Sequence, residues 1–337
     1  MAKIVLAMAT THGPQLHTSV EQWQLRVKAD KSRQHPFRDG VYSFDDLVRL
    51  RHNEGLEAKS SMAAQRSYHA RCHAAMGQLA DKWDEVGADV AVILGNDQDE
   101  IYKTDELNPA FMVFYGDTIP AYPVPEQEKK NLGPGIAEAQ HGHAPETYRE
   151  YRGVPDLGQH IIKTLAANDF DVAASKVWPE RARNGASHAF GHIYRQVMRD
   201  EVVPNVPIYQ NTFFPPNQPS AKRSYRFGQI VKQAVDSWNS DRRVAVFASG
   251  GMSHFVIDEE FDRAFVGALQ RRDKDFLTSI PLKELQSGTS ELKSWISLAG
   301  VLEDTNAEMH ELDYVPCYRS PAGTGTANGF YWWDIKP

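Results

Sequence analysis

The sequence has little cysteine, with only Cys72 and Cys317 among 337 residues. Two cysteines are too few for a disulfide framework, so we expect a reducing, cytoplasmic compartment. The first apolar run is interrupted by Thr10, Thr11 and His12, and it lacks the length and cleavage site of a signal peptide. No apolar run approaches the roughly 20 residues of a membrane helix, so we expect no membrane partner.

A basic stripe is also missing. The net charge is -7 and like charges form no block, so we expect no nucleic-acid partner. The Gly250-Gly251 turn lacks the surrounding glycines and lysine of nucleotide-binding loops. What remains is ordinary globular composition, 41% hydrophobic and 24% charged, together with thirteen histidines. That histidine count is a hint of metal chemistry.

Short apolar runs alternate with amphipathic segments along the chain. The runs predict central strands that are covered on both faces, at Lys3–Ala9, Asp89–Leu94, Asp171–Trp178, Pro207–Phe214 and Val244–Ala248. The amphipathic segments predict helices at Ser60–Val86, Leu157–Ala167 and Ser220–Trp238, the last with Ser220 as its N-cap. This alternation predicts the α/β class: a single domain, 1–337, with a central mostly parallel sheet flanked by helices. Val20–Ser43 and Pro120–Pro145 have the polar composition of surface segments.

Polar side chains follow several of the predicted strands. The ends carry His12, the run Asn96–Glu100, His188, Asn211 and the segment Ser249–His254. Each of these alone is typical of an ordinary loop or helix cap. In open α/β sheets, however, sites form beyond the carboxyl ends of the strands, so the convergence favours an active site on one rim. Imidazole and carboxylate ligands suit Fe, Mn or Zn, and a further histidine suits acid–base chemistry.

Several segments resemble the class III extradiol ring-cleavage dioxygenases, the superfamily of the protocatechuate 4,5-dioxygenase β-subunit. They are PIYQNTFFPPNQPSAKRSYRFGQIVKQAV, RRVAVFASGGMSHF, DEEFDRAF, GVPDLGQHIIKTLAANDFDVA, SGTSELKSWISLAG and the N-terminal strand that ends in His12-Gly-Pro. The segments occur in the family's order and span most of the chain. The resemblance is sparse at about 15–85 and 120–150, where we predict inserted surface segments.

The resemblance implies a non-haem Fe(II) centre held by two histidines and a glutamate, with Mn(II) or Zn(II) as alternatives. It assigns metal ligation to His12 and Glu291, the acid–base role to His254, and a substrate-side position to His188. The implied reaction is cleavage of a catechol-like or hydroxylated aromatic ring by O₂. The family also implies a homo-oligomer, and we expect a dimer.

Gln98 is where the chain departs from the family. The family's second histidine ligand follows the second strand in an Asn-Asp-His context, and here that context is Asn96-Asp97-Gln98. A neutral amide oxygen is a weaker ligand than imidazole. Three interpretations stay open: weak ligation by Gln98, replacement by another group (Glu100, Asp97 or His52), or loss of the metal. We favour an altered ligand set that contains Gln98 or Glu100.

Substrate contacts are predicted from Asn211, Ser253 and Arg223, the last because a guanidinium can hold a carboxylate. Two other functions compete with the dioxygenase. A metalloenzyme of the same fold that does not use O₂, of hydrolase, lyase or isomerase type, is favoured by Gln98. A non-enzymatic, partner-binding relative is favoured only by the inserted segments.

Overall fold

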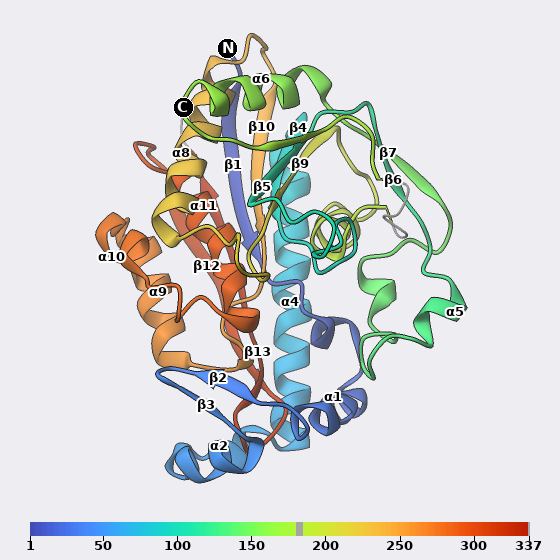
Figure 1. Ribbon diagram of the computed structural model, residues 1–337, viewed down its shortest axis with the longest axis vertical. Coiled ribbons are helices and arrows are strands. Elements are labelled where there is room, and N and C mark those ends of the chain that lie inside the picture. The colour runs from blue at the N-terminus through green and yellow to red at the C-terminus, as the bar shows by residue number, and fades with distance from the viewer. Residues whose placement is uncertain (180–184, 336–337) are drawn as a thin grey trace.

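A mixed nine-stranded sheet forms the centre of the computed structural model, which describes residues 1–179 and 185–335 (Figure 1). The strand order is β11-β13-β1-β10-β4-β9-β5-β8, and β12 pairs with β13. The strands of this sheet are β1 (Lys3–Thr10), β4 (Val90–Gly95), β5 (Phe111–Phe114), β8 (Ala173–Ser175), β9 (Asn205–Gln210), β10 (Arg243–Ser249), β11 (His254–Val256), β12 (Glu308–Tyr318) and β13 (Thr324–Asp334). Two hairpins lie outside it, formed by β2 (His35–Phe37) with β3 (Gly40–Tyr42) and by β6 (Thr118–Ala121) with β7 (Arg149–Arg152).

The four central strands β1, β10, β4 and β9 are neighbours and run parallel. All six residues of β4 and of β9 are buried, as expected for strands that are covered on both faces. The prediction of an α/β fold with a mostly parallel central sheet is confirmed by this core. Antiparallel strands flank it, with β13 beside β1 and β5 beside β9.

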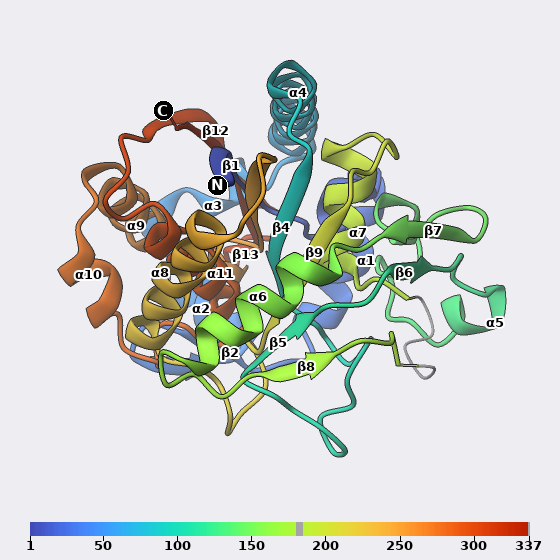
Figure 2. The ribbon, with the colours of Figure 1, turned by 90° about the horizontal axis from the view of Figure 1, so that it is seen from above.

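Helices cover both faces of the sheet (Figure 2). One face carries α6 (Pro155–Ala166), α8 (Ala221–Ser237) and α11 (Leu292–Val301), and the other carries α4 (Met62–Val86) and α7 (His188–His192). The three predicted helices correspond to α4, α6 and α8, and the predicted cap of α8 is confirmed because Ser220 Oγ accepts from the Arg223 N–H at 3.2 Å. The remaining helices are α1 (Trp23–Asp30), α2 (Phe44–Leu50), α3 (Leu56–Lys59), α5 (Glu126–Lys129), α9 (Glu259–Arg271) and α10 (Lys274–Ser279).

Two features of the sheet differ from the sequence prediction. The predicted central strand Asp171–Trp178 is wrong, because only the three residues of β8 are extended and they lie half-exposed at the edge. The long hairpin of β12 and β13 was not predicted. This hairpin extends the sheet beyond β1, because residues Leu6–Thr10 pair with the second half of β13.

The two segments predicted to be at the surface behave differently. Val20–Ser43 contains α1 and the β2–β3 hairpin, which Figure 1 shows at the end of the molecule opposite the chain termini. Its Trp23 is only 1% exposed, so this segment packs against the body of the protein. Pro120–Pro145 lies at the surface only in part: no residue of α5 is buried, but Ala139, Gln140 and Ala144 are. Among the described helices, none combines the length and the apolar composition needed to cross a membrane.

Candidate active site

The candidate site lies at the carboxyl ends of the central strands. His12 follows β1, Asn96 follows β4, and the Gly250–Ser253 turn follows β10 and leads to His254. Because β1, β10 and β4 are adjacent and parallel, these ends meet at one edge of the sheet. The 3₁₀ turn Ser287–Glu291 then brings Glu291 to the same edge from the start of α11.

The buried carboxylate of Glu291 contacts most of the other residues of the site. Its Oε2 lies 3.2 Å from His12 Nε2 and accepts the Gly251 N–H at 2.5 Å. Its Oε1 accepts amide N–H groups from Asn96 and Gln98, each at 3.2 Å. A buried carboxylate is costly unless it is paired and hydrogen-bonded, and Glu291 is both. The site is therefore built to hold a negative charge at this point.

The imidazole of His12 directs its Nε2 into the space between Glu291 and His188. Its Nδ1 lies 2.8 Å from Ser249 Oγ, and that hydroxyl donates its own hydrogen to the Ala189 carbonyl at 2.7 Å. Ser249 must then accept from His12, so the hydrogen of a neutral His12 sits on Nδ1. Burial lowers the pKa of His12 more than Glu291 raises it, so the ring favours this neutral form.

His188 is held in the same way by Glu100. The Glu100 carboxylate accepts from His188 Nδ1 at 2.5 Å and from the His188 backbone N–H at 3.0 Å. His188 Nε2 then faces His12 Nε2 at 3.1 Å. Burial lowers the pKa of His188, but the nearby Glu100 outweighs it and raises the pKa to about 9. Without a metal ion, a proton on His188 Nε2 can occupy the gap between the two rings.

His254 completes the group from the other side of Glu291. Its Nδ1 donates to the Met252 carbonyl at 2.7 Å, and its Nε2 lies 3.8 Å from Glu291 Oε1. A Cβ on Gly251 or Gly288 would lie only 2.3 Å and 2.0 Å from the His254 ring. The two glycines are therefore required for space around this imidazole. Burial lowers the pKa of His254, but Glu291 and the hydrogen bond to the Met252 carbonyl together raise it above its ordinary value.

The donor set of His12, His188 and Glu291 fits a divalent transition metal. Among the described residues, these three form the group whose ligand atoms all lie within 4.8 Å of one another. Both imidazoles have Nδ1 bonded elsewhere and Nε2 directed to the shared space. A carboxylate or hydroxyl behind the far ring nitrogen is the usual support of a metal-bound histidine. Two nitrogens and one oxygen are the ligand types expected for Fe, Mn or Zn.

Comparison with known families now decides the relationship. The family model described as the catalytic LigB subunit of aromatic ring-opening dioxygenase matches residues 110–325, which is more than half of the chain. The chain belongs to this dioxygenase family. The match includes His188, His254 and Glu291 and ends at the start of the last strand, β13.

One curated relative and one solved structure add detail. Gallate dioxygenase from Pseudomonas putida is 28% identical over 192 residues, which cover 53% of this chain and 54% of that protein. The chain thus spans about half the length of this relative. An uncharacterized protein of known structure from Escherichia coli K12 aligns over 97% of this chain and 99% of its own, with 11% identity and a TM-score of 0.45.

In this dioxygenase-family chain, three of the four predicted substitute ligands contact the centre or its loop, and His52 does not. Gln98 donates its amide N–H to Glu291 Oε1, so its carbonyl oxygen points elsewhere. Glu100 uses both carboxylate oxygens on His188. Asp97 accepts the backbone N–H groups of residues 100–102 and so shapes the loop. His52 is exposed and bonds the Arg49 carbonyl at 2.9 Å.

The three predicted substrate contacts have other partners in the described structure. Asn211 closes its own turn, because its side chain donates to the Phe214 carbonyl and accepts the Phe214 N–H. Ser253 donates to Asp262 at 2.6 Å and accepts the Asp258 N–H. Arg223 is exposed at the first turn of α8, and its guanidinium lies 4.4 Å over the Phe170 ring.

Three supporting residues were missed as functional candidates. Ser249 fixes His12, and Asp262 fixes the turn before His254 through the Ser253 N–H and hydroxyl. Lys293 is fully buried beside Glu291 in sequence, donates to the Thr212 carbonyl at 2.7 Å, and has its pKa lowered to about 7 by burial. Only Ser249, at the end of a predicted strand, carried a sequence signal.

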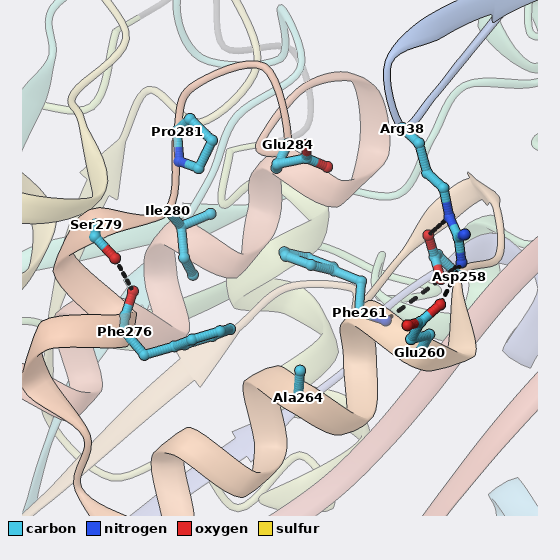
Figure 3. Close-up of a pocket in the computed structure, with 10 residues that line it drawn as sticks. All are labelled: Arg38, Asp258, Glu260, Phe261, Ala264, Phe276, Ser279, Ile280, Pro281 and Glu284. Carbon is cyan, nitrogen blue, oxygen red and sulfur yellow. Dashed lines mark hydrogen bonds and ion pairs between the residues drawn. The ribbon is translucent and has the colours of Figure 1, made fainter.

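A pocket of about 410 Å³ lies between α9, the end of α10 and the segment that follows α10 (Figure 3). Its floor is apolar, and at its rim Arg38 is bound to Asp258 and Glu260. A smaller cavity of about 40 Å³ shares Arg38 and Asp258 with it and touches Ser253 and Thr289. This cavity therefore reaches the backbone beside His254, since the His254 N–H donates to Thr289 Oγ1 at 3.2 Å.

Proposed function

We propose that the protein is a metal-dependent extradiol-type dioxygenase that cleaves a catechol-like or hydroxylated aromatic ring with O₂. The carrying observation is the convergence of two imidazole nitrogens and one carboxylate, with a third imidazole facing the same carboxylate. Membership of the ring-opening family supports the reaction class. The relative named gallate dioxygenase supports a hydroxylated aromatic as the substrate class.

The proposed ligands are His12, His188 and Glu291, with Fe(II) as the metal and Mn(II) or Zn(II) as alternatives. His188 thus takes the place that the family pattern gives to a histidine at position 98. Gln98 and Glu100 become supports: the first donates to Glu291 and the second orients His188. When bound, Fe(II) supplies a Lewis acid for the two substrate hydroxyls and a redox partner for O₂.

His254 is the proposed acid–base residue. Its Nδ1 hydrogen is committed to the Met252 carbonyl, so Nε2 is the nitrogen that can take a phenolic proton and later return it. Glu291 raises the pKa of His254, which favours proton uptake near neutral pH. Gly251 and Gly288 pack against the ring and keep it in this orientation.

The O₂-using reaction is preferred to the metalloenzyme that does not use O₂. That alternative was favoured by Gln98, because an amide replaced an expected imidazole. With His188 as the second nitrogen ligand, the set again has two histidines and one carboxylate, and this reason no longer applies. A site of that composition with open positions is typical of non-haem Fe(II) oxygenases.

Two measurements test the proposal. Protein purified without chelator is analysed for bound metal, and iron, manganese or zinc is expected. Anaerobic reconstitution with Fe(II) is then followed by an O₂-electrode assay over catechols, gallates and aminophenols. O₂ uptake with at least one of these compounds is expected, and its absence on all of them would reject the dioxygenase.

His254 is tested separately. His254→Ala should abolish ring cleavage while the metal content stays that of the parent protein, because its Nε2 lies 3.8 Å from Glu291 and outside the proposed ligand set. Turnover that survives this substitution would refute the acid–base role. Loss of metal as well would instead place His254 among the ligands.

A further inference from the structure

A second group of histidines lies on α4, outside the candidate active site. His69 and His73 are separated by one helical turn, and their Nε2 atoms are 3.1 Å apart. Residues at i and i+4 share one face of a helix, and two histidines with this spacing are a known way to bind zinc. His73 is exposed and His69 is half-buried, so the pair is open to solvent.

The separation of these nitrogens suits two ligands of one ion. Metal–nitrogen bonds of about 2.0–2.1 Å at a tetrahedral centre put neighbouring ligand nitrogens about 3.3 Å apart. The backbone of Thr18 is hydrogen-bonded to the His69 ring, and that of Leu16 to the His73 ring. Since the Nε2 atoms face each other, Nδ1 is the nitrogen left for each backbone carbonyl. In this tautomer both Nε2 lone pairs point into the same gap, where one cation can be bound between them.

The alternative to a metal ion is a proton shared by the two rings. Burial lowers the pKa of His69, and burial together with His69 lowers the pKa of His73, so these surroundings disfavour an extra proton on the pair. The Glu21 carboxylate lies close enough to His69 to act on it electrostatically. Glu21 is exposed and pairs with Arg66 at 3.3 Å, and its negative charge favours a cation at the histidine pair.

More histidines continue inward from this pair. His17 interacts electrostatically with His73, and its Nε2 lies 3.2 Å from His192 Nδ1. His192 is fully buried, and its Nε2 has no hydrogen-bond partner in the described structure. The His192 and His12 ring centroids are 6.3 Å apart. A row of imidazoles thus runs from the exposed face of α4 to the candidate metal centre.

We propose that His69 and His73 form a second metal site, which captures a divalent first-row transition ion at the outer end of this row. Cu(II), Ni(II) and Zn(II) are the ions that two imidazoles hold best, with Cu(II) the strongest. The existence of the site does not depend on the proposed dioxygenase function. Its use in loading the inner centre does rest on that function.

The site is tested by Cu(II) titration of the full chain with equilibrium dialysis. Wild type should bind two ions, His188→Ala one, His73→Ala one, and the double variant none with comparable affinity. His160→Ala, which removes a single histidine from α6, is the matched control and should match wild type. Equal binding by His188→Ala with and without His73→Ala would overturn the second site. Equal binding by wild type and His188→Ala would instead count against the inner centre alone.

A spectroscopic readout identifies the ligands independently. The Trp23 ring lies 6.5 Å from that of His69, so Cu(II) at the pair should quench its fluorescence. The quenching should be lost in Trp23→Phe, which still binds Cu(II), and it should need at least ten-fold more Cu(II) in His73→Ala. Electron paramagnetic resonance of the His188→Ala chain with one Cu(II) should show two coordinated nitrogens. A spectrum without imidazole nitrogen would refute the site.

Loading is measured as the rate at which metal-depleted protein makes Fe(II) resistant to a chelator. His73→Ala should slow this rate several-fold and leave the final amount of chelator-resistant Fe(II) unchanged. His160→Ala should change neither the rate nor that amount. Equal rates for wild type and His73→Ala would overturn the capture role.

Discussion

The loop that follows β4 and the first turn of α7 meet at the candidate centre, but they contribute different chemistry. The β4 loop is rich in carboxylates and amides, and each of them hydrogen-bonds to a neighbour: Asp97 to the loop backbone, Gln98 to Glu291, and Glu100 to His188. The α7 turn contributes one imidazole, whose Nε2 stays available. The β4 loop therefore supports the centre, and the α7 turn supplies a ligand.

This difference teaches that the density of polar residues is a poor guide to ligands. What distinguishes the candidate ligands His12, His188 and Glu291 is that each directs a ligand atom into one shared space. At Glu100 both oxygens accept hydrogen bonds from His188, and this contact makes His188 the better ligand. A residue that orients a ligand, as Glu100 orients His188, is a supporting residue and not itself a ligand.

The largest effect should separate these two regions by metal content. His188→Ala removes the proposed imidazole ligand, so metal content after reconstitution and desalting should fall by one ion per chain. Gln98→Ala removes only a hydrogen bond to Glu291 and should keep the metal. Elemental analysis of both variants is the measurement. The reverse pattern would assign ligation to the β4 loop.

A double substitution sharpens the same comparison. Gln98→His in the His188→Ala background restores the family's histidine beside Glu291, because position 98 already contacts that carboxylate. We expect this change to recover part of the metal binding, measured in the same way. No recovery would mean that the β4 loop cannot direct a ligand into the centre, which would strengthen the distinction between the two regions.

The next effect concerns the link between the two regions. Glu100→Gln keeps the size of the side chain but weakens its hold on His188 Nδ1. Loss of such a partner typically costs about 10–100-fold in metal affinity. Competition with a calibrated chelator would measure it. An unchanged affinity would show that Glu100 does not orient a ligand.

The contact between Glu100 and His188 should also appear in the pH dependence of the stability of the metal-free protein. His188 lowers the pKa of Glu100 to about 2 despite burial, so this stabilisation is present above the ordinary value of 4.5 and is lost as the pH falls towards 2. The pKa of His188 is about 9, so its contribution is full below 6.5 and is lost as the pH rises through 9.

The Tm of the metal-free protein should accordingly be highest between pH 4.5 and 6.5. It should fall by roughly 2–4 °C as the pH is raised to 9, if the pair contributes on the order of 1 kcal/mol. Differential scanning calorimetry of wild type and His188→Gln measures this, and the variant should lack this part of the decline. Parallel curves for the two proteins would argue against a charged pair.

The smallest effect is expected at Ser187. Its buried hydroxyl donates to the Asn96 carbonyl at 3.1 Å and joins the α7 turn directly to the end of β4. Ser187→Ala should lower the free energy of unfolding by about 0.5–1.5 kcal/mol, the usual value of one hydrogen bond. Urea denaturation measures it, and metal content should not change. A large loss of metal would mean that this single bond positions His188.

The sequence was sufficient to predict the parallel core and its helices. Runs such as Val90–Leu94 are apolar throughout, which is typical of strands buried on both faces. It was insufficient for β12 and β13. Pro316, Gly325 and Gly329 weaken any local strand signal there, and pairing with β1 over many residues outweighs it. The prediction of a central strand at Asp171–Trp178 failed for the opposite reason. This segment has an apolar composition, but its only strand, β8, lies at the edge of the sheet.

For the site, the strand ends could be predicted and the ligand set could not. His12 and the β4 loop follow strands directly, so topology alone brings them together. Which side chain has a free nitrogen depends on contacts between residues distant in sequence, such as Glu100 with His188. That information is absent from a local pattern.

The candidate ligands His12, His188 and Glu291 come from the beginning, the middle and the end of the chain. No fragment that lacks one of these parts contains the whole centre, and a partly folded chain does not assemble it. Metal bound at this centre stabilises only the native state. The fraction of metal-occupied molecules, measured at saturating metal, is therefore also a count of the chains that have completed folding.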